Sequence, residues 1–261
     1  MHHAAMSSPI AAIVFLAILP VVWLGYAAWR WQKTSFTLLE FSVHFLATLL
    51  VRFLWRAQVA PFPFPRGTGM VLISNHRSSV DPLFFGISMH WPGHWMVAKE
   101  YCEHPKFRWF LKLAQVIPTN RGGIDTAATK TAIRYAAQGD VVGMFPEGRI
   151  NITRELMLPG RPGAILVALK AKVPILPCYV EGAPYGGTAG SPLLMPARVR
   201  VRFGPLIDLS PYFDRELDNG ELGQLMLRCL KEIARLARRP DFEPQIAGRQ
   251  WKPASQDAIL G

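Results

Sequence analysis

Residues 70–82 read MVLISNHRSSVDP. The apolar run 70–74 predicts a buried β-strand that ends where the polar residues begin. Asp81-Pro82 then predicts the start of a helix, because proline is well tolerated in the first turn, where its missing N–H is not needed. A strand, a polar loop and a helix in this order are the building unit of an α/β sheet, in which sites gather at the carboxyl ends of the strands.

The same alternation of strands and helices continues along the rest of the chain. We expect further strands at 95–98, 115–118, 141–145, 173–180 and 197–204, and helices at 83–90, 105–114, 125–138, 163–171 and 219–239. The last of these strands alternates arginine with valine, which is typical of an edge strand with one face in water. The fold class that follows is α/β, with a central, mostly parallel mixed sheet flanked by helices.

The composition of the 261-residue chain excludes several classes of protein. Half of the residues are hydrophobic, which is far too many for an intrinsically disordered chain. The three cysteines form no C-x-x-C pair, which argues against a disulfide scaffold or a zinc cage and favours a reducing compartment. The formal net charge is +11, and an apolar excess combined with positive charge indicates a membrane surface.

The apolar excess is concentrated near the N-terminus. Residues 1–29 contain no Asp, Glu, Lys or Arg, and the twenty residues 10–29 are as long as a membrane-spanning helix. Arg30 and Lys33 follow this run, so the positive-inside rule predicts that the rest of the chain lies on the cytoplasmic face of the cell inner membrane. A cleavable signal peptide is the alternative, but no Lys or Arg precedes the run and no A-x-A site follows it.

Residues 34–56 have a different pattern. Polar residues recur every four positions on an otherwise apolar segment, at Glu40, His44, Thr48, Arg52 and Arg56. This spacing predicts a helix in the membrane interface or against the first helix, although an ordinary core-facing helix fits it equally well. The sequence leaves open whether the two segments form a full span or a hairpin in one leaflet. With a proline-rich linker at 61–69, it predicts a two-helix membrane anchor over 1–60 and a folded domain over 61–261.

Polar residues after the first strand indicate a general base. His76 and Asp81 are five positions apart, and they meet only if His76 lies in the loop while Asp81 opens the helix. A histidine held by a carboxylate is suited to removing a proton from a hydroxyl. The alternative is that Asp81 is a plain helix cap and His76 an ordinary loop residue.

Three further polar clusters follow the next strands. Lys99 follows the strand at 95–98, where a lysine either steadies an oxyanion or a phosphate or is an ordinary surface residue. Arg121 precedes two glycines, a combination that suits a phosphate group. In the segment FPEGR, we expect Glu147 in a tight turn, where it pins Arg149 or accepts a hydrogen bond from a substrate hydroxyl.

Four motifs follow one another along the chain: NHxxxxD at 75–81, RG at 121–122, FPEGR at 145–149 and VPILP at 173–177. Their order resembles the glycerolipid acyltransferase family, which includes the lysophosphatidate and glycerol-3-phosphate acyltransferases. The resemblance covers roughly residues 60–210. It implies that the predicted folded domain is an acyltransferase catalytic domain.

The resemblance implies a direct acyl transfer. His76 is expected to deprotonate the acceptor hydroxyl, which attacks the thioester of acyl-ACP or acyl-CoA, and Asp81 is expected to orient His76. The thioester is a co-substrate, and no resident cofactor or metal is implied. Lys99 resembles a residue near the thioester oxygen and is assigned to catalysis. The substrate-binding residues implied are Asn75, Arg77, Arg121, Glu147, Gly148, Arg149 and Pro177, with Arg121 on the acceptor phosphate.

The implied partners are a lysophospholipid acceptor, acyl carrier protein or a coenzyme A thioester, and membrane lipids. The favoured acceptor is 1-acyl-sn-glycerol-3-phosphate, which gives phosphatidic acid. Two departures bear on the acceptor: relatives that form phosphatidic acid usually read FPEGTRS, whereas here Arg149 directly follows Gly148, and Asn120 replaces a frequent Asp. The alternatives are therefore reacylation of another lysophospholipid and a non-catalytic lipid-binding protein of the same fold.

Two other function classes fit less well. A nucleic-acid binder would group its basic residues with exposed aromatic residues, but here they are dispersed. A metal hydrolase would need a glutamate beside His90 and His94, as in HExxH, and none is there. The sequence therefore predicts no nucleic-acid partner and no metal site.

Overall fold

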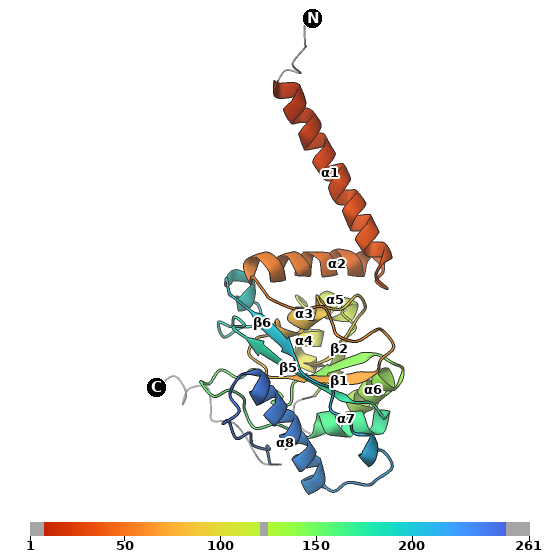
Figure 1. Ribbon diagram of the computed structural model, residues 1–261, viewed down its shortest axis with the longest axis vertical. Helices are drawn as coiled ribbons and strands as arrows, with labels where there is room; N and C mark the ends of the chain where they lie inside the picture. The colour runs from red at the N-terminus through yellow and green to blue at the C-terminus, as the bar shows by residue number, and fades with distance from the viewer. Residues whose placement is uncertain (1–7, 121–124, 249–261) are drawn as a thin grey trace, which may run out of the picture.

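The computed structural model describes residues 8–120 and 125–248, with side chains from residue 12 onward (Figure 1). A six-stranded sheet carries helices on both faces, and one long helix projects from an end of the molecule. The predicted α/β class, with a mostly parallel central sheet flanked by helices, is confirmed.

The sheet consists of β1 (Met70–Ser74), β2 (His94–Ala98), β3 (Ile117–Thr119), β4 (Val141–Met144), β5 (Ile175–Glu181) and β6 (Arg200–Phe203). The strand order is β3-β2-β4-β1-β5-β6, with β6 antiparallel to β5 and the other pairs parallel. All five residues of β1 are buried. A parallel strand covered on both faces needs no polar alternation, which explains its continuous apolar sequence.

The helices around the sheet are α3 (Asp81–Gly86), α4 (Lys99–Glu103), α5 (Arg108–Leu113), α6 (Thr126–Ala137), α7 (Gly163–Ala171) and α8 (Asn219–Leu236). The helix predicted at 105–114 is present as α5, which begins three residues later than expected. The short α4 before it was not predicted, and a break at 104–107 separates the two helices. His104 in the break is extended, with φ −68° and ψ 128°. The ring of the following Pro105 disfavours a helical conformation at this position.

Different helices cover the two faces of the sheet. Val71 and Ile73 of β1 pack with α6, α7 and α8, whereas Met70 and Leu72 pack with α3 and the segment before β1. The chain thus leaves β1 along one face through α3, and α7 carries it from β4 to β5 along the other (Figure 1). The loops after the adjacent strands β1 and β4 diverge, and α/β sheets bind ligands in such a crevice.

Helix α2 (Leu38–Leu49) lies across the end of the domain from which α1 (Ser8–Gln32) projects (Figure 1). A capping box between Thr37 and Glu40 starts α2, and a π-helical segment, η1 (Leu50–Leu54), continues it. The helix predicted over 34–56 is therefore corrected at both ends, because the cap sets its start and η1 alters its winding before Trp55.

Helix α2 and η1 carry two apolar faces. Phe41, Ala47, Val51 and Trp55 are buried against the domain. Leu39, Leu46 and Phe53, spaced seven residues apart, point outward and are 61%, 58% and 76% exposed. The polar positions predicted at 40, 44 and 48 are half-buried, and Gln115 donates a hydrogen bond to Glu40 at 2.9 Å. The outward surface of α2 therefore carries large apolar side chains, and these three polar residues do not lie on it.

Helix α1 is the one helix in the described residues that is long and apolar enough to cross a membrane. Its segment Ala12–Gln32 has a mean hydropathy of 2.1 and no buried residue in its most apolar window. The Trp23 ring meets Phe45 of α2 edge-on, with centroids 5.0 Å apart. Trp55, by contrast, is fully buried and donates a hydrogen bond to the Pro192 carbonyl at 3.1 Å. The residues just before the predicted boundary at 60 thus pack into the folded domain.

Candidate active site

His76 and Asp81 come together at the carboxyl end of β1. His76 lies in the loop and Asp81 is the first residue of α3. The Nδ1 atom of His76 is 2.9 Å from Oδ2 of Asp81, and the side chains are 15% and 0% exposed. The arrangement that the five-residue spacing requires, with the histidine in the loop and the aspartate opening the helix, is therefore present.

The Asp81 carboxylate is directed back into the loop. Its Oδ2 atom also accepts the backbone N–H groups of Arg77 at 2.7 Å and Ser78 at 2.8 Å. The helix-capping position belongs to Val80, so Asp81 is not a plain helix cap. A carboxylate at Nδ1 makes this nitrogen the donor and leaves Nε2 with a lone pair, as a general base requires.

The His76 ring is fixed from its face as well as its edge. It stacks on the ring of Phe145 with centroids 3.9 Å apart and an angle of 6° between the planes. Phe145 follows β4 and begins a tight turn, in which the N–H of Gly148 donates to the Phe145 carbonyl at 3.0 Å. Gly148 has φ +69°, a conformation that glycine adopts without strain. Sequence analysis missed Phe145, although it lies inside the FPEGR motif.

Glu147 supports the backbone of the histidine loop. One carboxyl oxygen accepts the N–H of His76 at 2.6 Å and the other accepts the N–H of Leu158 at 2.8 Å. The side chain is 2% exposed, and this burial raises the pKa of Glu147 to about 8. Both carboxyl oxygens of Glu147 thus accept hydrogen bonds from backbone N–H groups. The side chain of Arg149 is exposed.

Asn75 and Arg77 are bound by the protein's own backbone. The Asn75 amide donates to the Val180 carbonyl at 2.9 Å and accepts the Val180 N–H at 2.8 Å, which ties the loop to β5. The Arg77 guanidinium donates to three carbonyls, those of Asn151, Thr153 and Glu155. Both residues were predicted to bind substrate; the structure shows them shaping the two loops that form the site.

Asn151 is a second site residue that sequence analysis missed. Its side chain is 2% exposed; it donates to the Glu155 carbonyl at 3.0 Å and accepts the Thr153 N–H at 2.9 Å. Its backbone N–H donates to the His76 carbonyl at 2.7 Å. Asn151 therefore joins the Arg77-bound loop to the histidine loop.

The remaining predicted site residues lie elsewhere or outside the described residues. Lys99 is the first residue of α4, is 53% exposed and pairs with Glu103 at 3.5 Å. Pro177 is buried in β5 in register with Ile73 of β1. Arg121 lies outside the described residues. Substrate roles for these three residues stay predictions.

The nearby serine hydroxyls are engaged away from His76. Ser78 donates to the Pro184 carbonyl at 2.5 Å and Ser79 to the Ala189 carbonyl at 2.8 Å. The arrangement thus presents a base but no paired protein nucleophile among these neighbours, which suits removal of a proton from a bound hydroxyl.

His94, one of the two histidines considered for a metal site, is bound by other groups of the protein. His94 is buried, with Nδ1 2.9 Å from the Gln115 carbonyl oxygen and its ring stacked on Tyr135 at 3.8 Å. Over residues 8–120 and 125–248, no group of three or more His, Cys, Asp or Glu side chains is placed to hold a metal ion.

Comparison with known proteins adds three observations. Residues 60–181 match the acyltransferase family. The 1-acyl-sn-glycerol-3-phosphate acyltransferase of Bacillus subtilis is 29% identical over 123 residues, covering 47% of this chain and 60% of the relative. The enzyme of that name from Saccharomyces cerevisiae is 32% identical over 184 residues, covering 67% of this chain and 58% of the relative. The chain thus spans less than two thirds of the length of these relatives.

The fold is also shared with a solved structure. The crystal structure of the 1-acyl-sn-glycerophosphate acyltransferase from Thermotoga maritima matches 92% of this chain and 95% of its own, with a TM-score of 0.60 and 17% identity. At this identity the match establishes the fold alone, which agrees with the sheet and helices described above. The sequence matches show that residues 60–181 of this chain are similar to the acyltransferase family, and the two relatives compared are named 1-acyl-sn-glycerol-3-phosphate acyltransferases.

Proposed function

We propose that the protein is a membrane-bound O-acyltransferase. It moves a fatty acyl group from acyl-ACP or acyl-CoA to a hydroxyl of a phosphate-bearing glycerolipid, with 1-acyl-sn-glycerol-3-phosphate as the favoured acceptor and phosphatidic acid as the product. The observation that carries the proposal is the His76–Asp81 pair, at 2.9 Å, at the carboxyl end of β1. The family match and the names of the relatives support the same reaction class.

The proposed reaction begins with Nε2 of His76 removing the proton of the acceptor hydroxyl. The resulting oxygen attacks the thioester carbonyl carbon, while Asp81 stabilises the imidazolium that has formed. The carbon–sulfur bond then breaks, and the departing thiolate takes the proton from Nε2. The products are an ester and a free thiol, and His76 returns to its neutral form without a covalent intermediate on the protein.

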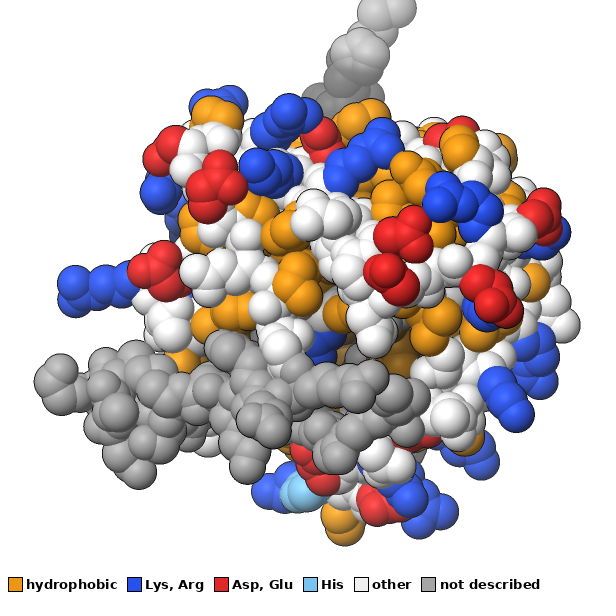
Figure 2. All heavy atoms as spheres, turned by 90° about the horizontal axis from the view of Figure 1, so that it is seen from below, with side chains coloured by type: hydrophobic (Ala, Val, Ile, Leu, Met, Phe, Trp, Pro, Cys, Tyr) orange, Lys and Arg blue, Asp and Glu red, His pale blue; other side chains and the backbone are white. Residues whose placement is uncertain are grey.

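Helices α1 and α2 support the proposed membrane location. Helix α1 is apolar and unburied, and the outward apolar face of α2 lies at the same end of the molecule (Figure 1). A spanning α1 would leave α2 flat in the interface, with Leu39, Leu46 and Phe53 against lipid. The opposite end of the molecule carries interspersed acidic and basic side chains, as Figure 2 shows, which suits an aqueous surface. We place the catalytic domain on the cytoplasmic face of the inner membrane.

An acceptor panel tests the proposed function. Full-length protein in neutral-lipid vesicles is given one acyl donor at a time, with glycerol-3-phosphate, lysophosphatidate or other lysophospholipids as acceptors, and thiol release and acylated product are both measured. Acyl transfer that His76→Ala abolishes, and that Lys130→Ala on the exposed surface of α6 leaves intact, supports the proposal. Lipid binding without thiol release would instead identify a non-catalytic lipid-binding protein.

The same panel decides between acceptors. Preference for another lysophospholipid over lysophosphatidate would favour the reacylation alternative, to which the Gly148-Arg149 sequence points. Running the panel with acyl-ACP and acyl-CoA in parallel identifies the donor. These measurements change the substrate assignment without changing the role of His76.

A further inference from the structure

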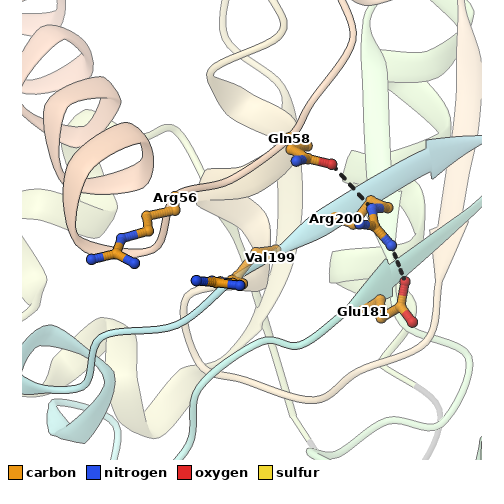
Figure 3. Close-up of a pocket in the computed structure, with 6 residues that line it drawn as sticks. Arg56, Gln58, Glu181, Val199 and Arg200 are labelled. Carbon is orange, nitrogen blue, oxygen red and sulfur yellow. Dashed lines mark hydrogen bonds and ion pairs between the residues drawn. The ribbon is translucent and has the colours of Figure 1, made fainter.

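A cavity of about 540 Å³ opens at the edge of the sheet beside β6 (Figure 3). It is lined by Arg56, Gln58, Glu181, Arg198, Val199 and Arg200. Its volume lies within the range of small-molecule sites, about 300–1,000 Å³. Three arginines and one glutamate give the lining a formal charge of +2, so a ligand of this cavity is expected to be an anion.

The protein neutralises only part of this positive charge. The single carboxylate of the lining, Glu181, is shared by Arg200 at 3.5 Å and Arg202 at 2.8 Å. No carboxylate in the described part of the chain pairs with Arg56 or Arg198, and both side chains are exposed. Two guanidinium groups are thus available at the cavity, and guanidinium geometry matches a phosphate bidentately.

The backbone at both arginines is held in place. Arg56 has φ +43°, a conformation that non-glycine residues keep only where the surroundings impose it. The preceding Trp55 is fully buried and fixes this point of the chain. On the other side, a Cβ on Gly182 would lie 2.3 Å from the carbonyl oxygen of Arg198. Only glycine lets the chain after β5 pass this close to Arg198, so the cavity wall is a built feature.

Exposed apolar side chains lie beside the arginines. The helical turn η2 (Ser191–Leu194) contacts the end of η1 through the hydrogen bond from Trp55 to the Pro192 carbonyl. Leu194 of η2 is 88% exposed and Phe53 of η1 is 76% exposed. Phe53 is three residues before Arg56 and Leu194 is four residues before Arg198, so an exposed apolar side chain occurs near each arginine in the chain. Cations next to exposed apolar side chains are typical of a protein surface that meets anionic lipid.

Glu181 in the cavity lining is on β5, next to β1, but the two unpaired arginines of the lining, Arg56 and Arg198, lie beyond β5 on the side away from β1. The strand order β1-β5-β6 is extended by Gln58, which pairs with Arg200 of β6. Neighbouring strands are about 4.8 Å apart, so Gln58 lies about 14 Å from β1, three such spacings away. The His76 ring stacks on Phe145 after β4, on the opposite side of β1. In a glycerophosphate, four bonds of about 1.5 Å separate the phosphorus from the neighbouring hydroxyl oxygen, about 6 Å at most.

We propose that this arginine cavity binds the headgroup phosphate of an anionic membrane phospholipid that is distinct from the acceptor. Arg56 and Arg198 hold the phosphate, and Phe53 and Leu194 contact the acyl chains of the same lipid. The inference rests on the membrane location given under the proposed function, and it does not depend on acyl transfer. It adds a second lipid contact, at the end of α2, to the anchoring by α1.

The test measures lipid binding in a catalytically silenced protein. Full-length His76→Ala protein in neutral detergent is titrated calorimetrically with dihexanoylphosphatidylglycerol, dihexanoylphosphatidylcholine or inorganic phosphate. The titration is repeated with Arg56→Gln, Arg198→Gln and the double substitution. The matched control is Arg228→Gln, which removes an exposed arginine from α8. Lysine at positions 56 and 198 keeps the charge and is expected to restore part of the binding.

Phosphatidylglycerol is expected to bind more tightly than the other two probes, and each glutamine substitution should weaken it about ten-fold, the loss of one charge-assisted hydrogen bond. Unchanged affinity in the double variant would overturn the proposal, and so would inorganic phosphate that binds as tightly as the lipid. If the double variant unfolds at a lower temperature than the parent protein, the phosphatidylglycerol affinity of the single Arg198→Gln variant is used instead, and an unchanged affinity there would overturn the proposal.

A last arm uses protein with an intact His76. The double arginine variant should keep the KM for lysophosphatidate in neutral-lipid vesicles. A raised KM would make the cavity an acceptor subsite and overturn the proposal. Absent acyl transfer in the unsubstituted protein would count against the proposed function alone, because the binding titrations do not require turnover.

Discussion

The Glu147→Gln substitution isolates one hydrogen bond beneath His76. Both oxygens of a glutamic acid can accept hydrogen bonds, whereas the amide nitrogen of glutamine only donates. One of the two backbone N–H groups, on His76 or on Leu158, then lies buried and faces a donor. An unsatisfied buried donor costs about 2 kcal/mol, which lowers the Tm of a domain of this size by about 4–8 °C. Thermal unfolding followed by circular dichroism measures this loss.

The kinetics of the same variant separate two roles for Glu147. Loss of the acceptor for the His76 N–H displaces the base, and a shift of about 1 Å costs about 100-fold in rate. We therefore expect kcat to fall by about 10- to 100-fold with little change in the acceptor KM, measured by thiol release. The control is Glu155→Gln, an exposed carboxylate in the following loop. A raised acceptor KM with unchanged kcat and Tm would refute the reasoning and favour direct contact with the substrate hydroxyl.

Glu147 also makes stability depend on pH. Burial raises its pKa from 4.5 to about 8 in the folded protein, so the folded state binds a proton that the unfolded chain releases between these values. Its contribution to stability is present below about pH 4.5 and is lost as the pH rises through about 8. Denaturant unfolding across this interval should show a declining free energy of unfolding that is flatter in Glu147→Gln. Equal slopes in both proteins would contradict the assignment.

Three further substitutions test the site. Asp81→Asn keeps the size of the side chain but removes the charge that stabilises the imidazolium, so kcat should fall by about 10²- to 10⁴-fold in the thiol-release assay; a near-normal kcat would exclude this role. Phe145→Leu removes the ring stacked on His76, worth about 0.5–1.5 kcal/mol, and should lower both Tm and kcat, whereas an unchanged kcat would show that stacking does not position the base. Arg121→Ala should raise the KM of a phosphate-bearing acceptor more than that of the acyl donor. If the variant and the unsubstituted protein had the same acceptor KM, Arg121 would not bind the acceptor phosphate.

The strands were predictable because the parallel part of the sheet is buried on both faces. β1 at Met70–Ser74 coincides with the apolar run from which it was predicted. Predicted helix boundaries were wrong where a local constraint on the backbone outweighed the composition of the segment. The break around Pro105 moves the start of the helix predicted at 105–114 to Arg108, the first residue of α5. The outward apolar face of α2 was hidden because both of its faces are apolar, so periodicity alone could not tell which residues face the domain.

The contact between His76 and Asp81 was predictable because the two residues are close in the sequence. His76 and Asp81 are five residues apart, and proline marks the helix start that brings them together. Glu147 meets the N–H of His76 across 71 positions, and Asn75 meets Val180 across 105. In both contacts the partner is a backbone group. Every residue has a backbone carbonyl, and every residue except proline has a backbone N–H. No pattern of residue types marks such a partner, so the sequence identified the motif residues but assigned them to substrate.

The two oxygens of the Asp81 carboxylate have different surroundings. Its Oδ2 atom receives three contacts, from Nδ1 of His76 and from the N–H groups of Arg77 and Ser78. Its Oδ1 atom is buried with no hydrogen-bond partner among the described residues, and an unsatisfied buried group is costly. In the proposed mechanism, Nε2 of His76 takes a proton from the acceptor, and a full positive charge then appears beside this buried carboxylate, where the local dielectric is low and the attraction is strong. The buried, incompletely satisfied carboxylate is thus stabilised most in the state that has just removed the proton, which is the differential stabilisation that catalysis requires.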